Sequence, residues 1–264
     1  MPTQEQKGTE FRALHEGDPF LIPNPWDAGS AKVFASLGFK ALATTSAGFA
    51  FTLGRLDGGV SLDEITAHVG VLDRATDLPV SVDLENGYGP EPEQAALAIT
   101  RAAEAGAVGG SIEDYDPKGE LYEFDRAVER VTAAAEAASA LGFPFTFTAR
   151  AENHLRGNPD IDDTIKRLQA YEQAGADVLY APLLRNADEV RAVCDAVSKP
   201  VNVLALPSLS MSAVTGAGAQ RVSVGSSLTW VAVGAMAAAA EEIRDTGSFA
   251  PLAAEVRIKE WLGG

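Results

Sequence analysis

Several residue types that define common protein classes are scarce in this sequence. Its 264 residues include one cysteine, Cys194, so a disulfide scaffold within the chain is excluded. No stretch approaches the roughly 18 consecutive apolar residues that a membrane-spanning helix needs. Residues 1–18 have no apolar run after a basic start, which a secretory signal peptide would show. We therefore expect a cytoplasmic protein that does not engage a membrane.

Positive charge is also scarce. Lysine and arginine together number 21, against 37 aspartates and glutamates, which gives a formal net charge of -16. An acidic surface of this size disfavours nucleic acid and anionic membranes, because both bind basic patches. We therefore expect no nucleic-acid partner. A small anionic substrate would need local cations or a metal ion in order to bind.

Histidine occurs only three times. His15 and His68 fall in helical stretches, and we expect them to face solvent. His154 follows a predicted strand, where a structural role is more common than a catalytic one. We therefore assign no catalytic role to a histidine.

A short unit recurs along the chain, in which a helical pattern ends in glycine and a brief apolar strand follows. Five instances cover residues 36–46, 104–114, 140–150, 173–182 and 216–226. In each, the glycine stands where a helix would close in a left-handed cap. Apolar strands that alternate with helices in this way indicate a parallel sheet buried on both faces.

Strands introduced by proline bring the number of candidate strands to eight. They cover about residues 20–23, 40–45, 79–83, 109–113, 145–149, 177–180, 200–204 and 221–224. Eight such units predict a (β/α)8 TIM barrel. The alternative, an open doubly wound sheet, would typically show a glycine-rich phosphate turn after its first strand, and PFLIPNPWDAGS has no GxGxxG. We expect residues 1–264 to form one barrel domain, with a C-terminal helical extension that packs either on its own barrel or on a neighbouring subunit.

Polar side chains gather where the predicted strands end, and in a barrel those ends share one mouth. The stretch PVSVDLENGYG ends a buried strand on Asp83 and Glu85, two residues apart, and a Gly-Tyr-Gly turn follows. Alternation points both carboxylates the same way, and the glycines let the backbone crowd the site. Glu113 ends the next strand in the same manner.

Other strand ends add polar groups of different kinds. They are Ser46, Ala47 and Gly48 after the second strand, Asp57 in the following loop, Arg150 at the fifth strand and Asn202 in the seventh. Carboxylates that converge without basic partners repel each other, so they usually hold a cation, and oxygen ligands suit Mg²⁺ or Mn²⁺ over zinc. A buried, unpaired Arg150 would be costly, so we expect it to meet carboxylates or an anionic ligand.

Together, these motifs resemble the isocitrate lyase/phosphoenolpyruvate mutase superfamily. The matching segments run in order from about Phe20 to Ser227, and they are NPWDAGSAKVF, ALATTSAGFA, DLENGYG, GGSIED, FTARAENHL and YEQAGADVLYAP. The match is closest to the branch with DxExGYG in place of DxDxGYG. The resemblance implies a (β/α)8 barrel whose last helix typically swaps onto a neighbour, giving a homodimer or homotetramer. It also implies Mg²⁺ binding and chemistry on a 2-oxo acid or its enolate.

The resemblance also implies roles for individual residues. The implied metal ligands are Asp83, which matches the direct ligand, together with Glu85 and Glu113. The implied substrate-binding groups are Arg150, Asn202 and the backbone of Ser46, Ala47 and Gly48. Asp57 matches an aspartate of a mobile loop near the metal, so the implied catalytic residues are Asp57 and Arg150.

The loop after the fourth predicted strand limits which reactions of the superfamily this chain could catalyse. Isocitrate and 2-methylisocitrate lyases carry a KKCGH-type loop there, whereas DYDPKGELYEFDRAVERV has neither cysteine nor histidine. We therefore predict a lyase that cleaves a C–C bond in a small 2-oxo or 2-hydroxy carboxylate through an enolate-like intermediate.

One alternative is a P–C bond enzyme similar to phosphonopyruvate hydrolase or phosphoenolpyruvate mutase, with Lys118 as its gating-loop lysine. Another is a barrel that binds carboxylate and metal without catalysis. A sugar-phosphate barrel would need a glycine-rich cradle, of which SVGSS is only a faint form.

Overall fold

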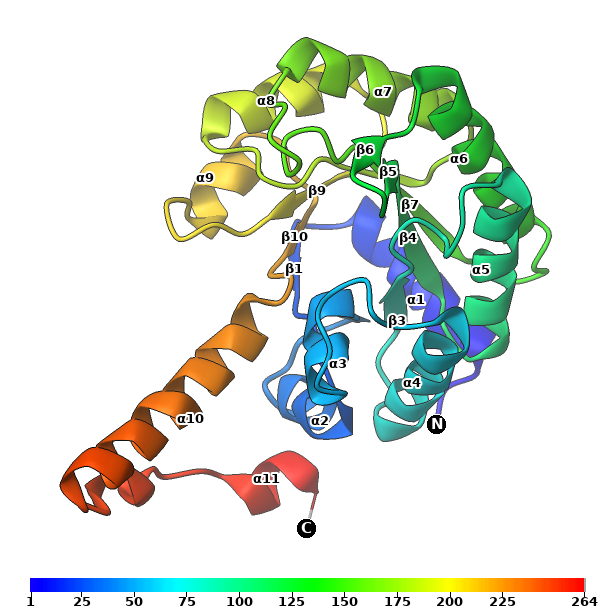
Figure 1. Ribbon diagram of the computed structural model, residues 1–264. Coiled ribbons are helices and arrows are strands. Elements are labelled where there is room, and N and C mark those ends of the chain that lie inside the picture. Colours follow the sequence, from blue (N-terminus) through cyan, green and yellow to red (C-terminus); the bar gives the residue numbers. More distant parts are fainter. Residues whose placement is uncertain (264) are drawn as a thin grey trace.

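The computed structural model describes residues 1–263 and contains an eight-stranded parallel sheet that curves into a nearly closed barrel (Figure 1). The strand order is β1-β10-β9-β8-β7-β4-β3-β2, and neighbours in this order are hydrogen-bonded. The two end strands also meet, because the N–H of Ala43 donates to the carbonyl of Pro23 at 3.0 Å. The predicted barrel fold is therefore confirmed.

The barrel strands lie where the sequence predicts them, to within about two residues at each end, as expected for boundaries read from a pattern. They are β1 (Phe20–Ile22), β2 (Leu42–Ala43), β3 (Val80–Asp83), β4 (Gly109–Glu113), β7 (Thr146–Arg150), β8 (Val178–Tyr180), β9 (Val201–Leu204) and β10 (Arg221–Ser223). A second, two-stranded antiparallel sheet was not predicted. It pairs β5 (Tyr115–Asp116) with β6 (Glu120–Leu121) in the loop after β4.

Helices lie between and beside the strands, and most of them cover the outside of the barrel (Figure 1). They are α1 (Gln4–Glu16), α2 (Ala28–Ser36), α3 (Ser46–Thr52), α4 (Leu62–Ala75), α5 (Pro92–Glu104), α6 (Phe124–Ser139), α7 (Ile161–Gln173), α8 (Ala187–Ala196), α9 (Met211–Gly216), α10 (Ser227–Thr246) and α11 (Ile258–Leu262), with a 3₁₀ turn η1 (Ala250–Ala253) between the last two. Within residues 1–263, no helix has both the length and the apolar character needed to cross a bilayer.

Side-chain caps and glycines set the helix ends. Asp27 begins α2 by accepting the N–H of Ser30 at 2.7 Å, and Ser61 begins α4 by accepting the N–H of Glu64 at 3.3 Å. The helix-closing glycines adopt positive φ angles of 109°, 72°, 104° and 110° at Gly106, Gly142, Gly175 and Gly218. A side chain disfavours this backbone conformation, so the glycines end each helix and lead the chain into the next strand.

Alternate residues of the barrel strands face different surroundings. Ile112, Phe147 and Val203 belong to the main hydrophobic core, which the sheet forms with the surrounding helices. Their neighbours Ser111 and Asn202 instead line a cavity inside the barrel. Because strand side chains alternate between the two faces, the sheet binds its helices through one set of residues and presents a polar interior through the other.

Helix α1 closes the barrel at the beginnings of the strands. Phe11 packs in one cluster with Phe20 and Val108, which lie at or next to the starts of β1 and β4. The His15 ring contacts both Phe11 and Phe20 edge-on, with ring centroids 4.8 and 5.1 Å apart. His15 and His68 are both buried, so the expectation that these histidines face solvent is wrong.

His68 supplies a test of stability against pH. It stacks on Phe49 with ring centroids 3.9 Å apart, and burial lowers its pKa to about 4. Below pH 6.5 the unfolded chain binds a proton there that the folded protein does not, so this histidine lowers stability as the pH falls. We expect His68→Phe to raise the free energy of unfolding relative to wild type by about 2 kcal/mol more at pH 5 than at pH 7.5. Urea denaturation at both pH values measures this, and a difference independent of pH would contradict it.

Helix α10 leaves the barrel instead of completing its ring of helices (Figure 1). Among its residues only Thr229 is buried. Trp230, Val231 and Met236 are 45%, 66% and 62% exposed. The chain then returns, and α11 packs against α2. Helix α10 therefore carries an apolar surface that its own barrel does not cover.

Candidate active site

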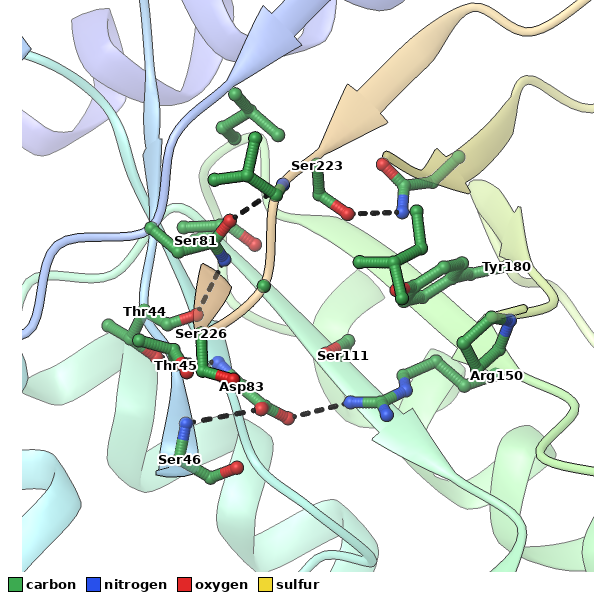
Figure 2. Close-up of a pocket in the computed structure, with 18 of the residues that line it drawn as sticks. Thr44, Thr45, Ser46, Ser81, Asp83, Ser111, Arg150, Tyr180, Ser223 and Ser226 are labelled. Carbon is green, nitrogen blue, oxygen red and sulfur yellow. Dashed lines mark hydrogen bonds and ion pairs between the residues drawn. The ribbon is translucent and has the colours of Figure 1, made fainter. Parts of the chain in front are cut away.

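A cavity of about 290 Å³ opens at the carboxyl ends of the strands and continues into the barrel. Figure 2 shows Asp83 near its centre, between the backbone of Ser46 and the side chain of Arg150. Each of the eight barrel strands contributes at least one residue to the lining. The cavity is therefore at the place where barrels of this type carry their chemistry.

Arg150 is the centre of a carboxylate cluster. Its guanidinium lies 2.9 Å from Asp83, 3.1 Å from Glu113 and 2.8 Å from Glu152, measured between nitrogen and oxygen. Burial acts against its charge, but Glu152, Glu113 and Asp83 outweigh burial and raise the pKa of Arg150 well above its usual value. The prediction that this arginine meets carboxylates is confirmed, and the cluster fixes its position in the cavity.

Asp83 is held from three sides. Its Oδ2 accepts the N–H of Ser46 at 3.3 Å, and its Oδ1 accepts from Arg150 at 2.9 Å and from the N–H of Glu85 at 3.3 Å. Its own N–H donates to the Thr44 hydroxyl at 2.8 Å. These contacts leave the carboxylate with one orientation, facing the cavity.

The turn after Asp83 is strained. Glu85 has a φ of 48° and Tyr88 a φ of 63°, backbone angles that residues other than glycine rarely adopt. Gly87, with a φ of 80°, lies so close to α5 that a Cβ would come 2.9 Å from the Cα of Ala95. Strained backbone of this kind gathers at functional sites, where the surrounding structure holds it in place. The DLENGYG motif therefore places Asp83 in the cavity wall, whereas Glu85 and the other predicted ligand, Glu113, are not among the lining residues.

Burial disfavours the charged form of two acids near Arg150, Glu85 and Glu113. Burial, followed by the nearby charges of Asp83 and Asp57, raises the pKa of Glu85 to about 8. Burial and then Glu152 raise the pKa of Glu113 well above its usual value, although Arg150 acts in the opposite direction. Several carboxyl groups are thus crowded near the cavity at a cost to their charged forms, and a bound cation would offset that cost.

A buried network supports the cluster from behind. Asp114 accepts the N–H of Glu152 at 2.8 Å, the Arg167 guanidinium at 3.0 Å and the Tyr171 hydroxyl at 2.5 Å. Asp114 is 3% exposed and Glu152 is fully buried. The network therefore ties α7 to the ends of β4 and β7 and fixes the backbone of Glu152 beside Arg150.

The other predicted site residues divide into two groups. Ser46, Ala47, Asp57 and Asn202 line the cavity, with Asp57 on an exposed loop at its rim. Gly48 is not among the lining residues, and its N–H is used by the Thr45 hydroxyl that caps α3. A Cβ on Gly48 would lie 2.7 Å from the hydroxyl of Thr229, so this glycine allows α10 to approach α3 closely.

Four further residues near the cavity lie outside the predicted set. They are Tyr180, Glu152, Arg156 and Arg221. Arg156 lies 3.2 Å from Glu113 and stacks over the ring of Tyr115 at 3.6 Å. Tyr180 ends β8, so reading only strand ends would have found it. Arg221 begins β10, and the strand-end rule excludes it.

The loop after β4 is a short hairpin. Strands β5 and β6 pair antiparallel, and Lys118 is exposed in the turn between them. The N–H of Lys118 donates to the Asp116 carboxylate at 2.8 Å. Lys118 does not line the cavity, so this arrangement gives it the place of a solvated turn residue.

The donor set fits a divalent cation in its chemistry. All candidate ligands are carboxylate oxygens, which Mg²⁺ and Mn²⁺ prefer. Glu85 Oε1 is buried and has no hydrogen-bond partner in the described part of the chain, which suits a metal ligand. In residues 1–263 no three His, Cys, Asp or Glu side chains are grouped as a ready-made metal site, since Arg150 draws the carboxylates toward itself. Binding a cation would therefore require small side-chain movements.

Fold and site define an α/β-barrel protein with an acid-rich, arginine-centred pocket at the carboxyl ends of its parallel strands. The family model described as phosphoenolpyruvate phosphomutase matches residues 11–244. The chain therefore belongs to this family, and the resemblance to the isocitrate lyase/phosphoenolpyruvate mutase superfamily is confirmed.

Three relatives show the range of the family around this chain. A crystal structure from Burkholderia cenocepacia J2315, named as a candidate lyase/mutase, is 50% identical and covers 99% of this chain and 97% of its own, with a TM-score of 0.95. The 2-methylisocitrate lyase of Halalkalibacterium halodurans is 30% identical over 75% of this chain and 67% of its own length. The oxaloacetate decarboxylase of Paraburkholderia xenovorans is 32% identical over 78% of this chain and 70% of its own.

Proposed function

We propose that this protein is a divalent-metal-dependent lyase that cleaves a C–C bond in a small 2-oxo or 2-hydroxy carboxylate through an enolate-like intermediate. The observation that carries the proposal is the single cavity in which Arg150 and the backbone of Ser46 converge on Asp83. Cleaving a bond beside a carbonyl leaves negative charge on oxygen. Prearranged donors in a site that excludes water stabilise such charge strongly.

Residues of the chain divide this work among them. Arg150 is already fixed in the cavity and would donate to an anionic oxygen of the substrate. We assign the substrate carboxylate to the backbone of Ser46 and Ala47, which line the opposite wall. Asn202 lies deeper, and Asp57 at the rim would orient water or the metal. Because Arg150 ends β7 and Ser46 begins α3, these two groups need little reorganisation when the substrate binds.

Asp83, Glu85 and Glu113 would hold the cation. When bound, Mg²⁺ or Mn²⁺ supplies Lewis-acid stabilisation of the developing enolate oxygen. Two observations support this assignment. The carboxylates outnumber the arginines in the cluster, and Glu85 Oε1 is buried without a hydrogen-bond partner in residues 1–263.

The names of the relatives span both chemistries, since the family model is described as phosphoenolpyruvate phosphomutase and a crystal structure that is 36% identical is named as a phosphonomutase, whereas other relatives support C–C cleavage. Two of them are named as a lyase and a decarboxylase, at 30% and 32% identity. The hairpin after β4 has no cysteine or histidine, so we do not propose the isocitrate or 2-methylisocitrate lyase reaction itself. Phosphonopyruvate belongs in the same substrate screen as the 2-oxo and 2-hydroxy acids, and its hydrolysis or rearrangement would favour the P–C alternative.

A barrel that binds carboxylate and metal without catalysis is the alternative from another class. The short β5–β6 hairpin favours it, because a longer loop at this position carries the general acid in the lyases with a KKCGH motif. The intact cluster around Arg150 argues against it. Turnover of any 2-oxo acid would exclude this alternative.

Thermal stabilisation by oxalate, a mimic of the pyruvate enolate, tests the proposal. We expect Mg²⁺ and oxalate together to raise the melting temperature, because both bind only the native state. Asp83→Ala should remove this shift, whereas Asp63→Ala should keep it. Asp63 is a matched control, since its carboxylate is 82% exposed and pairs with Arg101 at the surface. No shift in the wild-type protein at saturating ligand would overturn the proposal.

Three broader expectations belong with this proposal. The apolar face of α10 supports a homodimer or homotetramer in which α10 covers a neighbouring barrel, as the family pattern implies. Light scattering of the wild-type protein measures this assembly directly. The organisation as one domain over residues 1–264 stays a prediction, and its last residue, Gly264, lies outside the described residues. A cytoplasmic location also stays a prediction.

A further inference from the structure

Arg221 is a buried cation deep inside the barrel. It begins β10 and is 5% exposed. Its Nε donates to Asn202 Oδ1 at 2.8 Å, and one Nη donates to the Thr148 hydroxyl at 3.1 Å. The other Nη lies 3.2 Å from His15 Nε2. Since His15 Nδ1 lies 2.8 Å from the carbonyl of Phe11 and donates to it, Nε2 is the acceptor and the histidine is neutral.

No carboxylate neutralises this arginine. Within residues 1–263, no Asp or Glu oxygen lies within 4.0 Å of the Arg221 nitrogens. The other inward-facing arginine, Arg150, meets three carboxylates, and the buried Arg167 meets two. A buried charge without a counter-ion is expensive, so an anion that enters the barrel would be strongly favoured at Arg221.

Arg221 lines the same cavity as the candidate active site. Small side chains keep the space above it open, because Ser81, Ser111 and Ser223 stand where barrels usually carry large branched residues. The register connects the two ends of the cavity. Thr148, which accepts from Arg221, is paired with Ser111, and Ser111 is paired with Asp83.

We propose that Arg221 is a second anion subsite that binds the distal carboxylate of a dicarboxylic substrate, while the reacting end of the substrate lies at Asp83 and Arg150. The inference rests on the proposed function for the position of the reacting end. A guanidinium has five N–H groups, and the hydrogen bonds described above use three of them. The remaining two N–H groups, one on each Nη, are the donors that we assign to the distal carboxylate.

Asn202 gains a defined role under this proposal. Its Oδ1 accepts from Arg221, and its Nδ2 donates to the Ser223 hydroxyl at 3.0 Å. Both ends of the amide are therefore occupied by barrel residues. Asn202 acts as a positioning residue for the guanidinium, in addition to lining the cavity.

Matched pairs of ligands test the subsite. The diacids 2-oxoglutarate and 2-oxoadipate differ from the monoacids 2-oxovalerate and 2-oxohexanoate only at the distal end. Calorimetry with the full chain and Mg²⁺ gives the dissociation constant of each, with oxalate as the probe of the reacting end alone. In wild type we expect at least one diacid to bind about 10- to 100-fold more tightly than its monoacid, the range of a charge-assisted hydrogen bond.

Two variants assign that preference to Arg221. Arg221→Met should reduce the diacid preference to near one, and Arg221→Lys should keep part of it, because lysine retains the charge. Oxalate should bind all three proteins alike, and melting curves confirm that the variants fold.

The inference would be overturned if wild type bound neither diacid more tightly than its matched monoacid, and this comparison needs no variant. A preference that survives in Arg221→Met would overturn it as well. If oxalate fails to bind wild type but the diacid preference depends on Arg221, the proposed reaction fails and the subsite stands.

Discussion

Replacing Arg150 with methionine should abolish oxalate binding and any turnover, and it should lower the free energy of unfolding by about 3–5 kcal/mol at pH 8. The methionine keeps much of the side-chain volume but removes the one cation that Asp83, Glu113 and Glu152 share in residues 1–263. Breaking a buried ion cluster in this way is costly because the remaining charges stay desolvated. Urea denaturation and oxalate titration measure the two effects separately.

The loss of stability in Arg150→Met should depend on pH. Without the arginine, the pKa values of Glu113 and Glu152 rise further above their already raised values. The folded variant then holds protons that the unfolded chain has released, so its stability falls as the pH rises. The deficit relative to wild type should therefore be smaller at pH 5 than at pH 8. Arg156→Met is the control, since Arg156 is 33% exposed, contacts two of the same acids and should cost far less. A deficit equal in both variants would contradict the central role of Arg150.

Asp114→Ala is expected to destabilise the protein by about 3–5 kcal/mol without removing any group that lines the cavity. Arg167 and Tyr171 would lose their shared acceptor, and the N–H of Glu152 would lose its partner. Buried donors left without acceptors add to the cost. Chemical denaturation of the purified variant measures the loss.

Asp163→Ala provides the comparison for Asp114. Asp163 pairs with the same Arg167 side chain at 3.0 Å, but it lies in the first turn of α7 and its carboxylate is 30% exposed. We expect this variant to lose less than about 1 kcal/mol, as exposed ion pairs usually do. Equal losses in the two variants would show that the network behind Glu152 does not carry the stability assigned to it.

Much of the fold could be predicted because local signals repeat. Glycine caps at Gly106, Gly142 and Gly175 each separate a helix from an apolar strand, and these signals depend only on neighbouring residues. The β5–β6 hairpin could not be predicted, because a strand of two residues is too short to show an alternation of polar and apolar side chains. The wrong expectation that His68 faces solvent could have been avoided. Ile65, Val69 and Leu72 mark the buried face of α4, and His68 lies on that face by helical spacing.

The site residues that could be predicted are charged side chains at the last position of a strand. Asp83, Glu113 and Arg150 follow from reading the last residue of each strand. Their pairing does not follow, because it depends on the register between β4 and β7 and on the contact of Asp114 with α7. Arg221 could not be found in this way, since it lines the cavity but begins its strand.

The alternation along the barrel strands has a consequence for how such a protein changes over time. Ile112, Phe147 and Val203 hold the helices on the sheet, whereas Ser111 and Asn202, beside them in the chain, meet only the interior and its ligands. A substitution at an inward position that makes no ion pair, such as Ser111, can therefore alter the shape of the cavity without disturbing the contacts between the sheet and its helices. The residues that hold the helices on the sheet can therefore stay the same while the residues that line the cavity differ.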